Sequence, residues 1–105
     1  MAISAAAGGV GSIAVQLAAR AGAAVIGIAS PANHEWLAEQ GVKPESYGTD
    51  LIDRLHKTRI DAFIDAYGGG YVKLAVELGI PRDRICLLYT SLPAARLMRR
   101  CVPYP

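Results

Sequence analysis

The chain has 105 residues, enough for one small domain, and 52% of them are hydrophobic while 19% are charged. This balance excludes a disordered protein and is typical of an α/β protein whose parallel strands are buried on both faces. No apolar run approaches the roughly 18–20 residues that span a bilayer, and no signal-peptide pattern opens the chain, so we expect a cytoplasmic protein without membrane partners. Residues 1–85 hold eight Lys/Arg against nine Asp/Glu. This part of the chain therefore lacks the excess positive charge that is typical of nucleic-acid-binding proteins.

The first pattern in the chain is a strand, a glycine-rich turn and a helix. Ala2 and Ile3 form a short apolar run, and in residues 13–21 Ile13, Leu17 and Ala21 recur every fourth residue, as one face of a helix requires. The first N–H groups of such a helix have no partner within the helix and carry partial positive charge, so they suit a pyrophosphate.

The turn matches a dinucleotide-binding fingerprint whose first glycine is replaced by alanine, Ala6-x-Gly8-x-x-Gly11. Gly8 would let a phosphate approach the backbone, and Gly11 would let the helix lie against the strand. Small residues also occur wherever a helix packs tightly on a sheet, so this alternative stays open. The candidate cofactor-binding residues of the turn are Ala6, Gly8, Gly9, Val10 and Gly11.

The end of the second strand, predicted over residues 23–29, bears on which dinucleotide binds. In NAD sites an acidic residue about 20 positions after the glycines binds the adenosine ribose, whereas NADP sites avoid a carboxylate there. Ser30 stands 19 residues after Gly11, and a neutral hydroxyl favours NADP(H). Alternatively, Ser30 only caps the next helix, which Pro31 would begin.

Alternating helices and strands continue after Ser30. The patterns predict a helix over residues 31–40, a short strand over 42–47 interrupted by Pro44, a helix from residue 48, a strand over 60–66 and a helix over 71–78. Glycines 68–70 follow the strand at once. Because ligands bind beyond the carboxyl ends of strands in open α/β sheets, Gly68 and Gly69 are also candidate cofactor-binding residues, although a plain turn explains them as well.

The fold class that follows is α/β, a partial Rossmann-type doubly wound parallel sheet in three αβα layers, which we expect to be truncated at both ends. No catalytic triad, paired carboxylates or metal-ligand spacing is visible in the sequence, so we predict no catalytic or metal-binding residue.

The segment AAAGGVGSIAVQLA at residues 5–18 closely resembles the cofactor turn of medium-chain dehydrogenases/reductases, in particular the quinone oxidoreductase branch. Residues 25–34, 47–53 and 61–70 resemble the same family in the same order. The resemblance implies an NADP(H)-binding domain of an enzyme that passes hydride to a quinone, an enone or a related small carbonyl compound, and it allows a homodimer of the parent enzyme. It also implies that Ser30, His34 and Tyr47 gather around the 2′-phosphate, although the family has lysine where this chain has His34.

The resemblance covers residues 1–85, which we assign to the nucleotide-binding domain fragment. In residues 86–105 the string CLLYTS resembles the conceptual translation of a transposase end sequence used as a sequencing adaptor, so we predict a tail of foreign origin. The alternative is an ordinary strand over residues 85–89 followed by a short basic helix around residues 94–100.

Three functions compete at this point. We expect a fragment of an NADP(H)-dependent oxidoreductase that is inactive in isolation. A non-catalytic nucleotide-binding or sensor module of the same fold is the alternative. A methyltransferase-type domain is disfavoured, because Ser30 replaces the acidic residue that would hold the ribose there.

Overall fold

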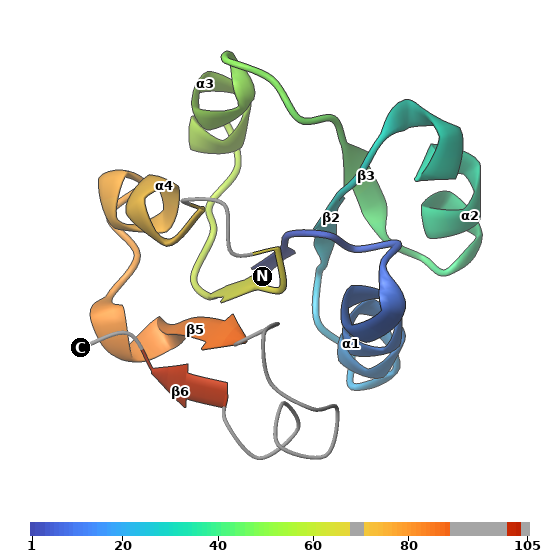
Figure 1. Cartoon of the computed structure of the whole chain (residues 1–105), viewed down its shortest axis with the longest axis horizontal. Helices are drawn as coiled ribbons and strands as arrows, with labels where there is room; N and C mark the ends of the chain where they lie inside the picture. The colour runs from blue at the N-terminus through green and yellow to red at the C-terminus, as the bar shows by residue number, and fades with distance from the viewer. Residues whose placement is uncertain (68–70, 89–100, 104–105) are drawn as a thin grey trace.

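A parallel sheet runs through the middle of the molecule, with helices on both sides (Figure 1). The computed structural model of the chain describes residues 1–67, 71–88 and 101–103. Within these ranges the sheet has the order β3-β2-β1-β4-β5-β6, in which β1 to β5 are parallel and β6 is antiparallel to β5. The order of the strands, although not the direction of β6, is that of dinucleotide-binding sheets. The strands are β1 (Ala2–Ile3), β2 (Ile26–Ile28), β3 (Lys43–Glu45), β4 (Phe63–Asp65), β5 (Ile85–Leu88) and β6 (Cys101–Pro103).

The helices divide between the two faces of the sheet, which confirms the predicted three-layer architecture. Figure 1 shows α1 and α2 on one side and α3 and α4 on the other. Val15 of α1 and Leu37 of α2 share one hydrophobic core with Ile3, while α3 and α4 share the second core with Ala2. The helical elements are α1 (Gly9–Arg20), η1 (Pro31–Asn33), α2 (His34–Glu39), α3 (Leu51–His56), α4 (Tyr71–Glu77) and η2 (Arg82–Arg84).

The adjacent residues of β1 show why both faces of the sheet are apolar. Side chains alternate between the two sides of a strand, so Ala2 and Ile3 enter opposite cores, and both are fully buried. Strand β3 lies at the edge of the sheet, where Pro44 is tolerated opposite Gly27. The structure therefore confirms the predicted order of elements, including the short strand interrupted by proline.

Helix α1 buries a different face from the one that the spacing of Ile13 and Leu17 indicated. Ile13 is 53% exposed and Leu17 is 62% exposed, whereas Val15 is fully buried. The helix also begins at Gly9, four residues earlier than expected. A periodic pattern identifies a helix face, but here the small residue Gly11 determines which side meets the sheet, and Val15 follows it one turn later.

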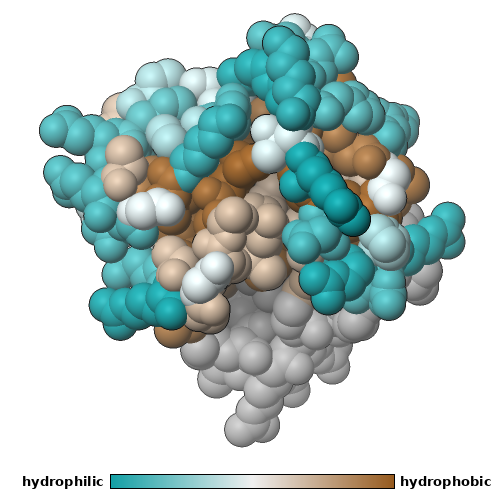
Figure 2. Space-filling model, turned by 180° about the vertical axis from the view of Figure 1, so that it is seen from behind, coloured by the Kyte–Doolittle hydropathy of each residue, from teal (hydrophilic) through white to brown (hydrophobic). Residues whose placement is uncertain are grey.

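The molecule exposes further hydrophobic surface when seen from behind, framed by hydrophilic side chains (Figure 2).

None of the helices within the described residues has the length and hydrophobicity that crossing a bilayer needs.

The segment after residue 85 contributes strands in the described part of the chain. β5 pairs in parallel with β4, as the alternative of an ordinary strand from residue 85 predicts. The basic helix considered around residues 94–100 lies outside the described residues. The foreign origin of residues 86–105 stays a prediction.

The burial of α1 predicts opposite outcomes for two neighbouring substitutions. Val15→Ala should lower the free energy of unfolding by about 1–3 kcal/mol, because it leaves a cavity against the sheet. Leu17→Ala should change it by no more than about 0.5 kcal/mol, because that side chain is mostly in solvent. Urea denaturation followed by circular dichroism measures both, and a larger loss for Leu17→Ala would contradict the observed rotation of the helix.

Candidate functional site

The candidate site lies where the carboxyl ends of β1 and β4 meet. From β1 the chain builds the sheet outward through β2 to β3, and then returns to place β4 on the other side of β1. The connections therefore leave β1 and β4 toward opposite faces, and open α/β sheets bind their ligands at such a switch point. The turn between β1 and α1 lies at this switch point.

Backbone hydrogen bonds hold that turn in a compact shape. The Ala6 N–H donates to the carbonyl oxygen of Ile28 at 3.0 Å, which ties the turn to the end of β2. The Gly8 N–H donates to the carbonyl oxygen of Ala5 at 2.9 Å. Ala5 itself adopts a left-handed conformation with φ of 49°, which costs free energy for a residue with a Cβ atom. Ala6 is fully buried, so its side chain serves packing.

Gly11 brings α1 into direct contact with this turn. A Cβ atom placed on Gly11 would lie 1.9 Å from the carbonyl oxygen of Ala5 and 2.7 Å from its carbonyl carbon. Neither backbone atom can move without breaking the turn. Only glycine fits at this position, as the fingerprint requires.

The amino end of α1 is open to ligand. Gly8 occupies the N-cap without a capping side chain, and the first turn has no acidic residue. Gly8, Gly9 and Val10 are exposed, and a Cβ atom placed on Gly9 would meet nothing within 4 Å. Packing therefore does not explain the glycine at position 9. Uncapped amides with partial positive charge beside open space can bind an anion.

A buried pair that the sequence analysis missed, Ser4 and Asp65, lies at the switch point. The Ser4 hydroxyl donates to Oδ1 of Asp65 at 2.7 Å and accepts the Ala66 N–H at 2.9 Å, while the Tyr67 N–H donates to the same Oδ1 at 2.9 Å. Ser4 is fully buried and Asp65 is 1% exposed. The pair joins the ends of β1 and β4. The only sequence signal was a carboxylate, Asp65, directly after the apolar residues 62–64 of a predicted strand.

Three tyrosines form a cluster beside this buried pair. The rings of Tyr47, Tyr67 and Tyr71 lie with their centroids 5.6–5.8 Å apart, in the tilted and edge-on arrangements that aromatic pairs prefer. The Tyr47 hydroxyl accepts the Ala5 N–H at 3.1 Å. Burial raises the pKa of Tyr47 and of Tyr71 above the ordinary value of tyrosine, so both phenols are neutral at physiological pH. The Tyr47 side chain is thus hydrogen-bonded to the backbone of the turn between β1 and α1.

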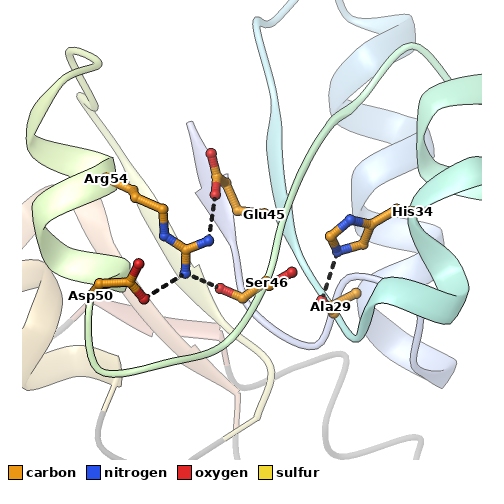
Figure 3. Close-up of polar contacts among 6 residues, drawn as sticks. All are labelled: Ala29, His34, Glu45, Ser46, Asp50 and Arg54. Carbon is orange, nitrogen blue, oxygen red and sulfur yellow. Dashed lines mark hydrogen bonds and ion pairs between the residues drawn. The ribbon is translucent and has the colours of Figure 1, made fainter.

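Ser30 and His34 share the connection after β2. The Ser30 hydroxyl is exposed and accepts a hydrogen bond from the Asn33 side-chain amide at 3.0 Å, and it makes no helix-capping bond. Figure 3 shows Nε2 of His34 directed at the carbonyl oxygen of Ala29, at 3.0 Å. Because a carbonyl oxygen only accepts, Nε2 carries the hydrogen and Nδ1 is left for other partners.

Arg54 holds the loop that carries Tyr47. Its guanidinium donates to the carbonyl oxygen of Ser46 at 2.7 Å and lies 3.2 Å from the Glu45 carboxylate and 3.5 Å from that of Asp50 (Figure 3). The Arg54 side chain is only 29% exposed, although charged residues of amphipathic helices usually face solvent. A basic residue at helical spacing gave no sign of this contact with the preceding loop.

Two of the predicted site residues, Gly68 and Gly69, lie outside the described residues. Within the described ranges, no group of three or more His, Cys, Asp or Glu side chains is placed to hold a metal ion. The structure thus brings Ala6, Gly8, Gly9, Val10 and Gly11 together in one turn, with Tyr47 bonded to it and with Ser30 and His34 on the neighbouring connection.

Comparison with known proteins gives matches only among solved structures. No family model matches the sequence, and no curated protein does. The CurK enoyl reductase matches with a TM-score of 0.71 and 26% identity over 93% of this chain and 32% of that chain. The quinone oxidoreductase from Coxiella burnetii matches with a TM-score of 0.65 and 31% identity over 93% of this chain and 31% of that chain.

A third match concerns the fold alone. An alcohol dehydrogenase superfamily protein from Novosphingobium aromaticivorans has a TM-score of 0.72 and 23% identity over 99% of this chain and 33% of that chain. The chain therefore spans about a third of the length of each solved structure.

The buried hydrogen bond between Ser4 and Asp65 predicts that a small substitution has a large effect on stability. Ser4→Ala should lower the free energy of unfolding by about 1–3 kcal/mol, because it leaves the buried Ala66 N–H without its acceptor and Asp65 without one donor. Ser12→Ala is the matched control, since the Ser12 hydroxyl only makes an exposed bond of 3.3 Å to the Gly9 carbonyl. Equal stability of the two variants in urea denaturation would contradict this account of the pair.

Proposed function

We infer that this chain, which belongs to the medium-chain dehydrogenase/reductase superfamily, holds the pyrophosphate of a nicotinamide dinucleotide at the amino end of α1. Two of the matched structures are reductases by name, an enoyl reductase and a quinone oxidoreductase. They support an oxidoreductase fragment as the general assignment.

The observation that carries this proposal is the contrast between two glycines of one turn. Gly11 is required by packing, because any side chain would strike the Ala5 backbone, whereas Gly9 faces open space. A glycine that the fold does not need is explained by a ligand that approaches the backbone closely. The amides of the first turn are uncapped, and they supply the partial positive charge that a pyrophosphate needs.

We further propose that the dinucleotide is NADP(H). Ser30 places a neutral hydroxyl after β2, where a carboxylate would repel the 2′-phosphate. Nε2 of His34 is engaged by the Ala29 carbonyl, so Nδ1 is the ring nitrogen left for the phosphate, and it could donate to the phosphate only in the protonated imidazolium. For Tyr47 the bond to the Ala5 N–H supports a role in holding the turn, and its predicted contact with the phosphate stays a prediction.

The complete enzyme, in this proposal, reduces a quinone, an enone or a related small carbonyl compound. The bound reduced nicotinamide would supply the hydride, while the described residues bind and orient the cofactor. We expect no turnover by the isolated chain, because the solved structures it matches are about three times as long. A small-molecule substrate, a homodimeric parent enzyme and a cytoplasmic location belong to the same proposal.

Substitution at Gly9 tests the pyrophosphate site. Gly9→Asp should weaken the binding of NADPH at least about tenfold, because a carboxylate would stand among the amides that hold the pyrophosphate. The thermal midpoint should stay unchanged or rise, since an acidic residue in the first turn of a helix is stabilising and the position has space. Titration followed by nicotinamide fluorescence measures the affinity.

Gly9→Asn is the matched control for charge, because it has nearly the same size and is neutral. It should retain most of the affinity that Gly9→Asp loses. If both variants bind NADPH as well as the unchanged chain, the pyrophosphate does not lie at this helix end.

Substitution at Ser30 tests the preference between the two dinucleotides. Ser30→Asp should weaken NADPH binding at least about tenfold and leave NADH binding unchanged or tighter, because the carboxylate repels the 2′-phosphate and accepts bonds from the ribose. Ser30→Ala controls for the loss of the hydroxyl. An equal effect of Ser30→Asp on both dinucleotides would argue against an NADP(H) site at this position.

A further inference from the structure

Three consecutive backbone amides are hydrogen-bonded where the chain leaves β1 and enters the turn. The two outer amides, those of Ser4 and Ala6, donate to carbonyl oxygens of the neighbouring strands β4 and β2, each at 3.0 Å. The middle amide, that of Ala5, donates instead to the Tyr47 hydroxyl at 3.1 Å. A side chain from the loop after β3 therefore completes the hydrogen bonds of this part of the backbone.

The turn depends on the conformation of Ala5. Its φ of 49° is left-handed, and an alanine adopts this conformation only at a cost in free energy. The carbonyl oxygen of Ala5 accepts the Gly8 N–H at 2.9 Å, and the same oxygen leaves no room for a side chain on Gly11. A hydrogen bond that holds Ala5 in place therefore also holds the first amides of α1.

Tyr47 is held through its ring and through the backbone that precedes it. Its ring centroid lies 5.8 Å from that of Tyr67 and 5.7 Å from that of Tyr71. The Arg54 guanidinium donates to the carbonyl oxygen of Ser46, the residue directly before Tyr47, at 2.7 Å (Figure 3). This charge-assisted bond fixes the backbone from which the phenol extends to the turn.

Two carboxylates anchor the Arg54 guanidinium in turn. The guanidinium lies 3.2 Å from the carboxylate of Glu45 in β3 and 3.5 Å from that of Asp50, directly before α3. Arg54 thus joins the strand before the loop, the loop itself and the helix after it. A lysine in its place has no planar fork and could not make these contacts together.

We propose that Arg54 and Tyr47 act together as positioning residues for the dinucleotide. Arg54 fixes the loop, the Tyr47 hydroxyl holds Ala5, and Ala5 holds the amides that bind the pyrophosphate. This inference rests on the pyrophosphate site proposed above. It assigns Tyr47 to the part that NADPH and NADH have in common, whereas a contact with the 2′-phosphate would affect NADPH alone.

Amide hydrogen exchange in the ligand-free chain, measured by NMR, tests the contact between Tyr47 and Ala5 without any cofactor. Tyr47→Phe should speed the exchange of the Ala5 amide at least about tenfold, because this N–H loses its acceptor. Tyr71→Phe is the matched control, since it removes a hydroxyl from the same aromatic cluster, and it should leave this amide unchanged. Equal exchange of the Ala5 amide in Tyr47→Phe and in the unchanged chain would overturn the proposal.

Titration followed by nicotinamide fluorescence tests the effect on the cofactor. Tyr47→Phe should weaken NADPH and NADH binding by the same factor, at least about fivefold. Arg54→Met should weaken both as well, and the double variant should bind within about twofold of Tyr47→Phe, because Arg54 acts through Tyr47. Lys57→Met is the control for charge, since it removes an exposed cation at the end of the same helix, and it should leave both affinities unchanged.

A loss of NADPH affinity alone in Tyr47→Phe would overturn the proposal, because it would place the phenol at the 2′-phosphate. Full additivity of the two substitutions would also overturn it, because Arg54 would then act independently of Tyr47. If Arg54→Met does not fold, Arg54→Lys gives the same comparison. If the unchanged chain binds neither dinucleotide, the proposed function fails, and the exchange of the Ala5 amide still shows whether Tyr47 holds the turn.

Discussion

The contact between α1 and the turn that precedes it determines most of what this molecule can do. Gly11 approaches the Ala5 backbone so closely that no side chain fits between them. This approach sets the rotation of the helix, which buries Val15 and leaves Ile13 and Leu17 in solvent. It also leaves the uncapped amino end of the helix at the carboxyl end of β1. One steric requirement thus determines which face of α1 packs in the core and places the partial positive charge of the helix end at the candidate site.

Polar contacts across the top of the sheet keep this arrangement rigid. Ser4 and Asp65 join the ends of β1 and β4 from within the core. Tyr47 reaches from the loop after β3 to the Ala5 N–H, and Arg54 fixes that loop through the Ser46 carbonyl. Groups from three separate connections are therefore tied together at this edge of the sheet, which suits a ligand that must be held along its length.

The sequence predicted the architecture well because glycines and apolar runs separate the elements locally. Gly22 and Gly41, for example, end their helices with positive φ. Prediction from the sequence failed where the structure depends on residues that lie far apart in the chain. The spacing of Ile13 showed a helix face but could not show which face the sheet covers. Ser4 and Asp65 are 61 positions apart, and no local pattern links a serine in a turn with a carboxylate in a later strand.

Pro44 has a consequence for how the protein behaves in a crowded solution. The Lys43 N–H and the Glu45 carbonyl both bond inward to the second strand, so the nitrogen of Pro44, between them, is on the outward side of the sheet. A proline nitrogen has no hydrogen to donate. The outer border of the sheet thus lacks a donor at its centre and has an exposed lysine beside it, two features that discourage other chains from joining the sheet and forming aggregates.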